Sequence, residues 1–231
     1  MLRLHTDIKE IDKYVQYITE SYDLNIERAT VIEIPTIPMD ELKKISWNIG
    51  LVCGGSGTGK TTILAHHFGL PIKPIYDEEK PIISQFEELE PEEVCDVLES
   101  VGLSSVPVWL RKPHELSMGE KARLDLCYAI IKSPKDGTIV IDEFTSTINR
   151  EVAKSLAFAL QRYVRQNNLK IVIATCHFDM LNFLQPDWIF NLNKKNNGEA
   201  EIEHLNYSDG TYSDYKNVNP NCILSETYQV K

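Results

Sequence analysis

The sequence has no run of about 18 apolar residues, which excludes a helix that spans a membrane. The amino-terminal stretch also lacks the apolar core of an export signal. The five cysteines are scattered, odd in number and without C-x-x-C spacing, as is typical of reduced thiols rather than of disulfides or a zinc site. These absences predict a cytoplasmic protein with no direct membrane insertion.

The sequence has no excess of basic side chains either, and its formal net charge is −10. Residues 77–99 hold ten acidic side chains and one lysine, a net of −9, which leaves −1 for the rest of the chain. We interpret this acidic segment as a solvated helix face, with a docking surface as the alternative. The low count of basic residues argues against a protein that coats nucleic acid. A local basic face remains open, and its candidates are Arg162, Arg165 and Lys170.

Short apolar runs alternate with amphipathic helical patterns, which predicts an α/β fold with a largely parallel sheet. The predicted strands cover residues 29–34, 49–53, 138–141, 170–174, 188–192 and 200–205. The predicted helices cover residues 8–22, 61–68, 116–131 and 151–165, with one more in the acidic segment. We expect a short extended piece at 81–86 and a loop-rich connection at 102–115.

The predicted helix at 8–22 places apolar side chains at spacings of three and four. Such a stripe usually packs into a core, and we expect packing here. The alternative is that Tyr14, Tyr17 or Tyr22 stacks on an adenine ring.

The predicted strand at 49–53 leads into a glycine-rich turn of the form G-x-x-x-x-G-K-[ST], which is typical of a phosphate-binding loop. Its glycines let successive backbone N–H groups converge on a phosphate, and the following helix turns its positive end toward the same anion. Lys60 adds a charge against the outer phosphates, and the hydroxyl of Thr61 can bind magnesium. The candidate nucleotide-binding residues are Gly54, Gly55, Ser56, Gly57, Thr58, Gly59, Lys60, Thr61 and Thr62.

Two predicted buried strands after this loop end in polar residues. Asp142 and Glu143 follow the strand at 138–141, and His177 follows the strand at 170–174. We assign Asp142 to magnesium and Glu143 to the activation of water. In a parallel sheet His177 would emerge at the same edge, where it can sense the terminal phosphate.

A second candidate phosphate site lies at residues 116–120, where Ser117 and Glu120 form a capping box at a helix start. The hydroxyl of Ser117, the amide of Gly119 and the helix dipole suit an anion. Gln85 lies between this helix and the loop along the sequence, where it can reach magnesium and water. Residues 145–149 are candidates for a contact across a dimer.

The order of these motifs resembles the ATP-binding-cassette (ABC) ATPase family over about residues 49–192. The resemblance implies an α/β P-loop NTPase with a mostly parallel sheet core, N-terminal antiparallel strands and a short helical subdomain. It implies one ABC-type ATPase domain over 1–231, with a reduced helical subdomain carrying the signature motif at about 81–131. The residues beyond this pattern, at about 206–231, are expected to form a loosely held tail.

The same resemblance implies a head-to-tail homodimer that forms with ATP and Mg²⁺. Each nucleotide would be held by the phosphate loop of one chain and by Ser117 and Gly119 of the other. Gln85 would contact magnesium and water from a hinge loop, and His177 would be the switch histidine. The catalytic residues would then be Glu143, His177, Lys60 and Gln85, and the metal ligands Thr61, Gln85 and Asp142.

The chain departs from the family pattern at four positions. Met118 replaces a usual glycine, Glu120 a glutamine, Phe144 a proline and Asn149 an aspartate. These changes leave Ser117 in place, so they affect turnover and dimer coupling more than ATP binding. No aromatic residue before the phosphate loop aligns with the position that stacks on adenine.

Short strings around 47–50, 142–150, 175–179 and 185–188 resemble a branch of soluble, stand-alone ABC-type ATPases that are sometimes fused to a predicted acetyltransferase. Our first hypothesis is therefore an ATPase whose ATP-driven dimerisation acts on a nucleic acid or a protein. The alternative is the ATP-hydrolysing subunit of a transporter with a separately encoded permease. A nucleotide-dependent switch ranks third and a P-loop kinase last.

Overall fold

The structure is a computed structural model, which describes residues 2–5, 8–26, 31–134, 137–146, 148–193 and 202–204. The strands are β1 (Leu2–His5), β2 (Val31–Ile34), β3 (Ile49–Cys53), β4 (Thr138–Ile141), β5 (Lys170–Thr175), β6 (Trp188–Asn191) and β7 (Ile202–His204). The α-helices are α1 (Lys13–Ser21), α3 (Met39–Leu42), α4 (Lys60–His67), α5 (Pro91–Ser100), α6 (Val106–Trp109), α7 (Met118–Lys132), α8 (Arg150–Gln166) and α9 (Leu181–Leu184). Short 3-10 helices cover Ile82–Gln85, Pro113–Glu115 and Phe178–Met180.

The main sheet has the strand order β4-β5-β3-β6-β7. The first four strands run parallel, and β7 pairs with β6 in the antiparallel sense. A separate antiparallel pair, β1 with β2, precedes this sheet along the chain. The predictions of a mostly parallel α/β core and of N-terminal antiparallel strands are both confirmed.

Side chains of β3 alternate between two cores, one on each face of the sheet. Ile49 and Leu51 join the cluster that α5, α7 and α8 cover, whereas Val52 joins the cluster with α4 and β2. Strands buried on both faces read as continuous apolar runs, which is why β3 was recognisable from the sequence. At Gly50 a Cβ atom would lie 2.0 Å from Cζ2 of Trp188, so only glycine fits beneath that indole.

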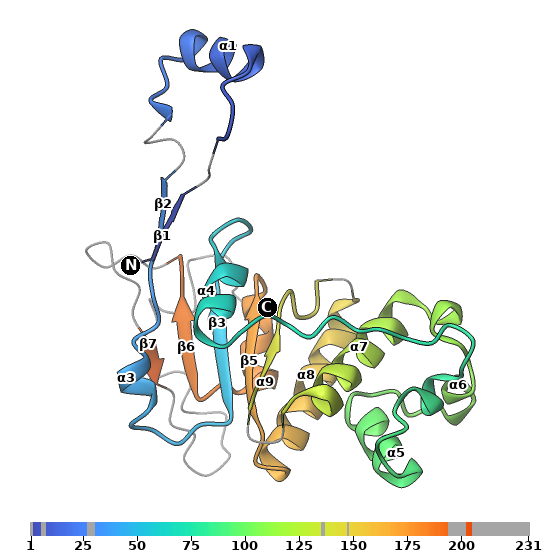
Figure 1. Cartoon of the computed structure of the whole chain (residues 1–231). Helices are drawn as coiled ribbons and strands as arrows, with labels where there is room; N and C mark the ends of the chain where they lie inside the picture. Colours follow the sequence, from blue (N-terminus) through green and yellow to red (C-terminus); the bar gives the residue numbers. More distant parts are fainter. Residues whose placement is uncertain are drawn as a thin grey trace, which may run out of the picture.

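The helices on the α7 side form the right-hand part of Figure 1, with α5 and α6 farthest from β3. The segment at 81–131, which we propose as the helical subdomain, contains two 3-10 helices, α5, α6 and α7. One expectation for this segment was wrong, because residues 82–85 form a 3-10 helix instead of an extended piece. The predicted loop-rich connection at 102–115 contains the single helical turn α6. Both turns are short, so their sequences show too little periodicity to identify them.

The predicted helix at 8–22 exists as α1, but its expected role in the core was wrong. It begins only at Lys13, because Asp12 caps it by accepting hydrogen bonds from the N–H groups of Tyr14 and Val15. None of its nine residues is buried. In Figure 1 it lies away from the main sheet, beyond the antiparallel pair of β1 and β2.

The predicted tail at 206–231 lies outside the described residues, as do positions 200, 201 and 205 of the last predicted strand. Within the described ranges, every helix is too short or too polar to cross a lipid bilayer.

Candidate nucleotide site

The phosphate loop connects the carboxyl end of β3 to the first residue of α4. Gly57 and Gly59 have φ angles of +76° and +91°, a region that side chains rarely enter. A Cβ atom on Gly59 would also lie 2.7 Å from Cδ1 of Ile34, at the end of β2. The glycines are therefore needed both for the turn and for the close approach of β2.

Internal hydrogen bonds hold the loop around Lys60. The ammonium of Lys60 donates to the carbonyls of Gly54 and Gly55, at 2.9 and 2.7 Å. The hydroxyl of Thr58 donates to the Gly55 carbonyl, and the Gly55 N–H donates to Oδ1 of Asn193. The positive charge thus lies at the centre of the loop, where the sequence predicts the outer phosphates.

Thr61, in the first turn of α4, meets the predicted magnesium ligand from β4. Its hydroxyl donates to Oδ2 of Asp142 at 2.5 Å. The described residues contain no group of three His, Cys, Asp or Glu side chains that would hold a metal alone. One hydroxyl and one carboxylate nevertheless fit Mg²⁺ that arrives with a nucleotide, because this ion is usually held by one or two carboxylates together with phosphates and water.

Glu143 lies in a strained segment directly after Asp142. Glu143 and Thr145 have φ angles of +50° and +68°, which are rare for residues with side chains and rarer still for β-branched threonine. Between them, the buried Phe144 donates its N–H to the Ala174 carbonyl of β5. The exposed side chain of Glu143 borders a cavity of about 250 Å³, which α7 and the loop at 71–74 also line.

His177 lies two residues beyond the end of β5 and is half-buried. Its Nδ1 is 3.4 Å from the hydroxyl of Thr145, and its N–H donates to the hydroxyl of Thr175. Burial lowers the pKa of His177, and the charge of Arg150 lowers it further. The imidazole is therefore neutral at pH 7, and through Thr145 it is linked to the strained segment that carries Glu143.

Ser117 caps α7 and is exposed, as the predicted role at a second phosphate site would require. Its hydroxyl and N–H both donate to Oε2 of Glu120, at 2.7 and 2.8 Å. These hydrogen bonds keep the pKa of Glu120 below its usual value, so the carboxylate stays charged. If Ser117 binds a phosphate as predicted, the charged Glu120 would compete with that phosphate for the Ser117 hydrogen bonds, whereas a glutamine at this position would be neutral.

Gln85 does not join the other predicted site residues. Its amide NH₂ donates to the carbonyls of Asp77 and Lys80, and its oxygen accepts from the Asp77 N–H. These bonds fix the side chain within its own loop, next to the helical segment. The described structure therefore gives no support for Gln85 as a ligand of magnesium or of the attacking water.

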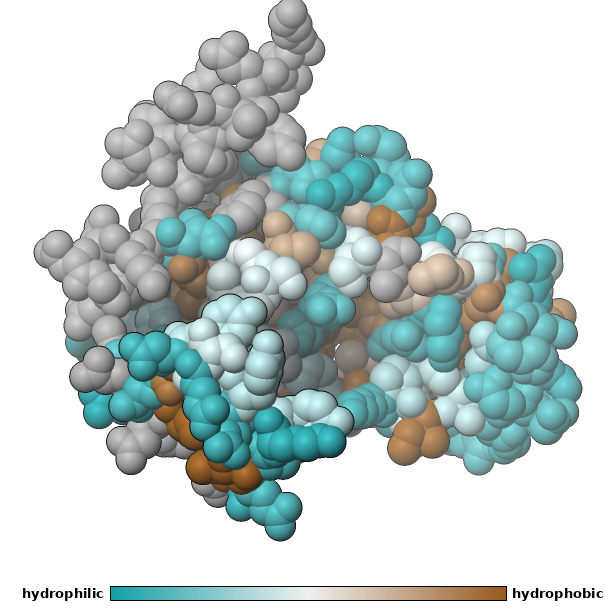
Figure 2. Space-filling model, turned by 90° about the horizontal axis from the view of Figure 1, so that it is seen from above, coloured by the Kyte–Doolittle hydropathy of each residue, from teal (hydrophilic) through white to brown (hydrophobic). Residues whose placement is uncertain are grey.

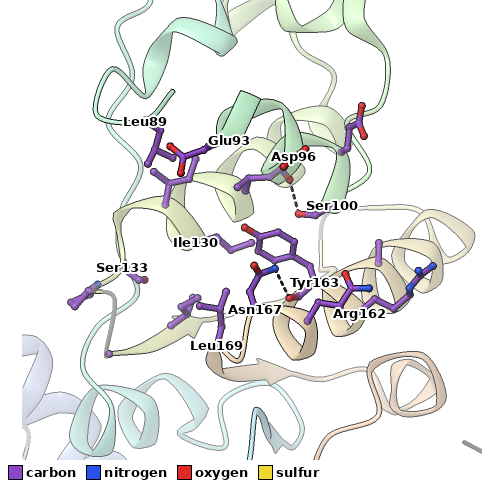
Figure 3. Close-up of a pocket in the computed structure, with 18 residues that line it drawn as sticks. Leu89, Glu93, Asp96, Ser100, Ile130, Ser133, Arg162, Tyr163, Asn167 and Leu169 are labelled. Carbon is purple, nitrogen blue, oxygen red and sulfur yellow. Dashed lines mark hydrogen bonds between the residues drawn. The ribbon is translucent and has the colours of Figure 1, made fainter. Parts of the chain in front are cut away.

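A second cleft, of about 950 Å³, lies between α5 and α8 (Figure 3). Glu93 and Asp96 face it from α5, and Arg162 and Tyr163 from α8. It includes Ile139, at the amino-terminal part of β4, whereas the phosphate loop follows the carboxyl end of β3. The cleft is therefore separate from the nucleotide site.

Of the basic face predicted from α8 and Lys170, Arg162 and Lys170 are exposed, but Arg165 is engaged within the molecule. Arg165 donates to the Gln185 carbonyl and to Asp187, which also accepts from the N–H groups of Asn48 and Ile49. Lys170 lies over the ring of Trp47. Arg165 is part of this internal network, so it is less available to a nucleic-acid backbone than Arg162 or Lys170.

Sequence reasoning missed Asn193 as a residue of the site, and it named Thr145 only as a candidate for a contact across a dimer, not as a partner of His177. Asn193 follows β6, which pairs with β3, so the rule that parallel strands end at one edge would have found it. Thr145 gave no such signal, because its contact with His177 depends on the left-handed backbone at that residue.

A phosphate loop between a parallel strand and a helix, with a threonine and an aspartate joined beside it, defines a P-loop nucleotide-binding domain. No protein-family model matches the chain. Among curated proteins, the methionine import ATP-binding protein MetN of Clostridium tetani is 24% identical over 162 residues, covering 70% of this chain and 47% of that protein. The spermidine/putrescine import ATP-binding protein PotA of Vibrio vulnificus is 32% identical over 88 residues, covering 38% of this chain and 22% of PotA.

Solved structures show the same fold. The ATP-binding cassette MJ0796, in a dimeric post-hydrolysis state bound to ADP and Pi, superimposes with a TM-score of 0.52 at 15% identity, covering 71% of this chain and 87% of that one. CbiO1 of Clostridium perfringens, part of the ABC transporter complex CbiONQ, gives a TM-score of 0.50 at 18% identity, covering 68% and 76%. The predicted ABC-type ATPase resemblance and fold class are confirmed.

The chain spans less than half the length of the curated relatives described above. These relatives are named as import proteins, not as members of the stand-alone branch, so membership of that branch stays a prediction.

Proposed function

We propose that the protein is an ATPase that hydrolyses ATP with Mg²⁺ between two copies of the chain. The observation that carries this proposal is the hydrogen bond between Thr61 and Asp142, which joins the phosphate loop to the acidic end of β4. A phosphate loop alone holds a nucleotide. Joined to Asp142, Glu143 and His177 at one edge of the sheet, it has the groups that hydrolysis requires.

In this proposal the loop amides and Lys60 hold the phosphates, and Thr61 and Asp142 hold magnesium. When bound, Mg²⁺ would neutralise charge that develops on the phosphate oxygens. Glu143 orients a water molecule and accepts its proton as the water oxygen attacks the γ-phosphorus and the bond to the ADP oxygen breaks. The neutral His177 contacts the γ-phosphate, and its contact with Thr145 links the loss of this phosphate to Thr145.

The second copy supplies Ser117 and Gly119 in the proposal. Both lie at the start of α7, and Ser117 is exposed. The amide end of a helix suits a phosphate, and the dimeric cassette structures with the same fold support a dimer.

The second part of the proposal concerns the process that ATP hydrolysis drives. The names of the curated relatives favour the energy-supplying subunit of an import system over action on a nucleic acid or a soluble protein. The internal ion pair of Arg165 also removes one of the three residues of the expected nucleic-acid face.

Steady-state hydrolysis of MgATP by the purified chain tests the catalytic part. Glu143→Gln should bind ATP and lose about 100-fold or more in turnover, within the range typical of general bases. Glu41→Gln, a change at an exposed carboxylate on α3, serves as the matched control and should keep full turnover. Full turnover by Glu143→Gln would contradict the role of Glu143.

The partner is tested by isolating the ATP-bound Glu143→Gln form separately from membrane and soluble fractions. Retention of an integral membrane protein by the Glu143→Gln form, with no change in the ATPase rate of the unmodified chain on adding DNA or RNA, would support the import subunit. Stimulation by nucleic acid at low salt would support the other reading.

A further inference from the structure

The arm, by which we mean the described residues up to Ile34, carries an apolar surface that the described chain leaves uncovered. Tyr14 and Ile18 lie on α1, and Ile11 and Tyr22 lie just before and just after it; these four side chains are 67%, 48%, 63% and 72% exposed. Seen from above, the arm is nearest the viewer and shows hydrophobic groups among hydrophilic ones (Figure 2). A concentration of exposed apolar side chains of this kind usually marks an interaction site.

The arm joins the rest of the described chain beside the phosphate loop. Ile34, the last residue of β2, is 4% exposed and packs directly against Gly59. Three residues later, the N–H of Ile37 donates to Nε2 of His67 on α4. From this anchored base the arm extends beyond the end of the sheet at which β3 enters the phosphate loop (Figure 1).

We infer that α1 packs on a second copy of the chain, beside the start of that copy's α7. This inference rests on the proposed function, in which the phosphate loop of one copy meets Ser117 of the other. An arm that begins at the loop rim then borders the partner's α7. Met118 and Leu110 are 70% and 69% exposed in that region. Arg111, the residue after Leu110, forms an ion pair of 3.8 Å with Glu120 in the first turn of α7, which places Leu110 near the helix start.

The charges of the arm favour this occupant over a lipid surface. Residues 8–26 hold four acidic and two basic side chains, whereas helices that lie on anionic membranes carry an excess of lysine and arginine. A helix of nine residues also covers much less than the roughly 800 Å² per partner of a stable interface. The arm therefore strengthens a dimer that ATP forms and does not create one by itself.

The test measures the dissociation constant of the MgATP-dependent dimer by analytical ultracentrifugation, with Glu143→Gln present throughout to prevent hydrolysis. Tyr14→Ser combined with Ile18→Ser should weaken the dimer about tenfold or more, as expected when central apolar contacts are lost. The control combines Gln16→Ser with Glu20→Ser, an exposed pair on the polar face of the same helix, and should change the constant less than twofold. ATP binding by the monomer should stay unchanged in both.

Direct contact is tested by combining the arm changes with Leu110→Ser and Met118→Ser. The combined loss should be smaller than the sum of the separate losses, since both sets remove the same contacts. Fully additive losses would overturn the proposed location on the partner.

An unchanged dissociation constant in the arm variant would overturn the inference, as would unchanged dimerisation with loss of binding to phosphatidylglycerol vesicles. The latter result would identify a lipid surface as the occupant. If the protein with Glu143→Gln as its sole substitution forms no dimer with MgATP, that result would instead contradict the proposed function. The failure of the inference and the failure of the proposed function are therefore distinguishable.

Discussion

Strand β3 and helix α1 are both rich in apolar side chains, but only β3 buries them. All five residues of β3 are buried, because β5 and β6 flank the strand and the two cores cover its faces. None of the residues of α1 is buried, because this helix lies beyond the antiparallel pair β1–β2 and away from the main sheet. An apolar pattern therefore predicts an element but not the surface that covers it.

The largest expected effect is on the free energy of unfolding, when one apolar side chain is truncated in β3 and, for comparison, one in α1. Leu51→Ala should lower the free energy of unfolding by about 3 kcal/mol, since Leu51 is fully buried and its loss leaves a cavity. Ile18→Ala should change it by less than about 0.5 kcal/mol, since the side chain is half-exposed on the arm. Urea unfolding of the nucleotide-free chain measures both. Equal losses would show that the arm is packed against the body.

Lys60→Ala tests the phosphate loop alone. It should weaken ATP binding by about 100-fold, which corresponds to roughly 2.7 kcal/mol, because the outer phosphates lose their cation. Isothermal titration with ATP measures the affinity. Lys44→Ala, at an exposed lysine away from the loop, should bind normally, whereas normal binding by Lys60→Ala would refute the site assignment.

Glu120→Gln tests the part of the site that a second copy would supply. The change removes a negative charge beside Ser117 and keeps a side chain that can accept the same hydrogen bonds. In the non-hydrolysing Glu143→Gln background, the MgATP-dependent dimer should tighten by about threefold to tenfold, because repulsion from the phosphate is removed. A weaker dimer would indicate that the charged capping box is needed for assembly.

The smallest expected effect concerns the base of the arm. Burial, with the nearby His66, lowers the pKa of His67, and its Nε2 accepts a hydrogen bond from the Ile37 N–H. As the pH falls, the unfolded chain therefore binds a proton at His67 before the folded chain does. The free energy of unfolding is retained above about pH 6.5 and declines as the pH falls below that value. Urea midpoints at pH 7 and pH 5 should differ less in His67→Gln, whose side-chain oxygen accepts at both values. An equal decline in both proteins would contradict this role.

The sequence was sufficient to predict the parallel core and the residues at its edge, because buried strands and the phosphate loop have strong local signatures. Thr61 and Asp142 were expected to share an ion, and they form a hydrogen bond. The position of Gln85 was not predictable, since it depends on backbone carbonyls of a short irregular loop. The exposure of α1 was equally hidden, because its stripe has the same periodicity as a core helix.

The central claim is that each nucleotide site needs two copies of the chain. Its most direct test is the mass of Glu143→Gln in solution, measured with and without MgATP, beside Glu143→Gln combined with Ser117→Arg. We predict that the first protein is a dimer only with MgATP, and that the second binds ATP but stays a monomer. A Glu143→Gln protein that stays monomeric with bound MgATP, or a Ser117→Arg variant that dimerises as well as its parent, would contradict the account.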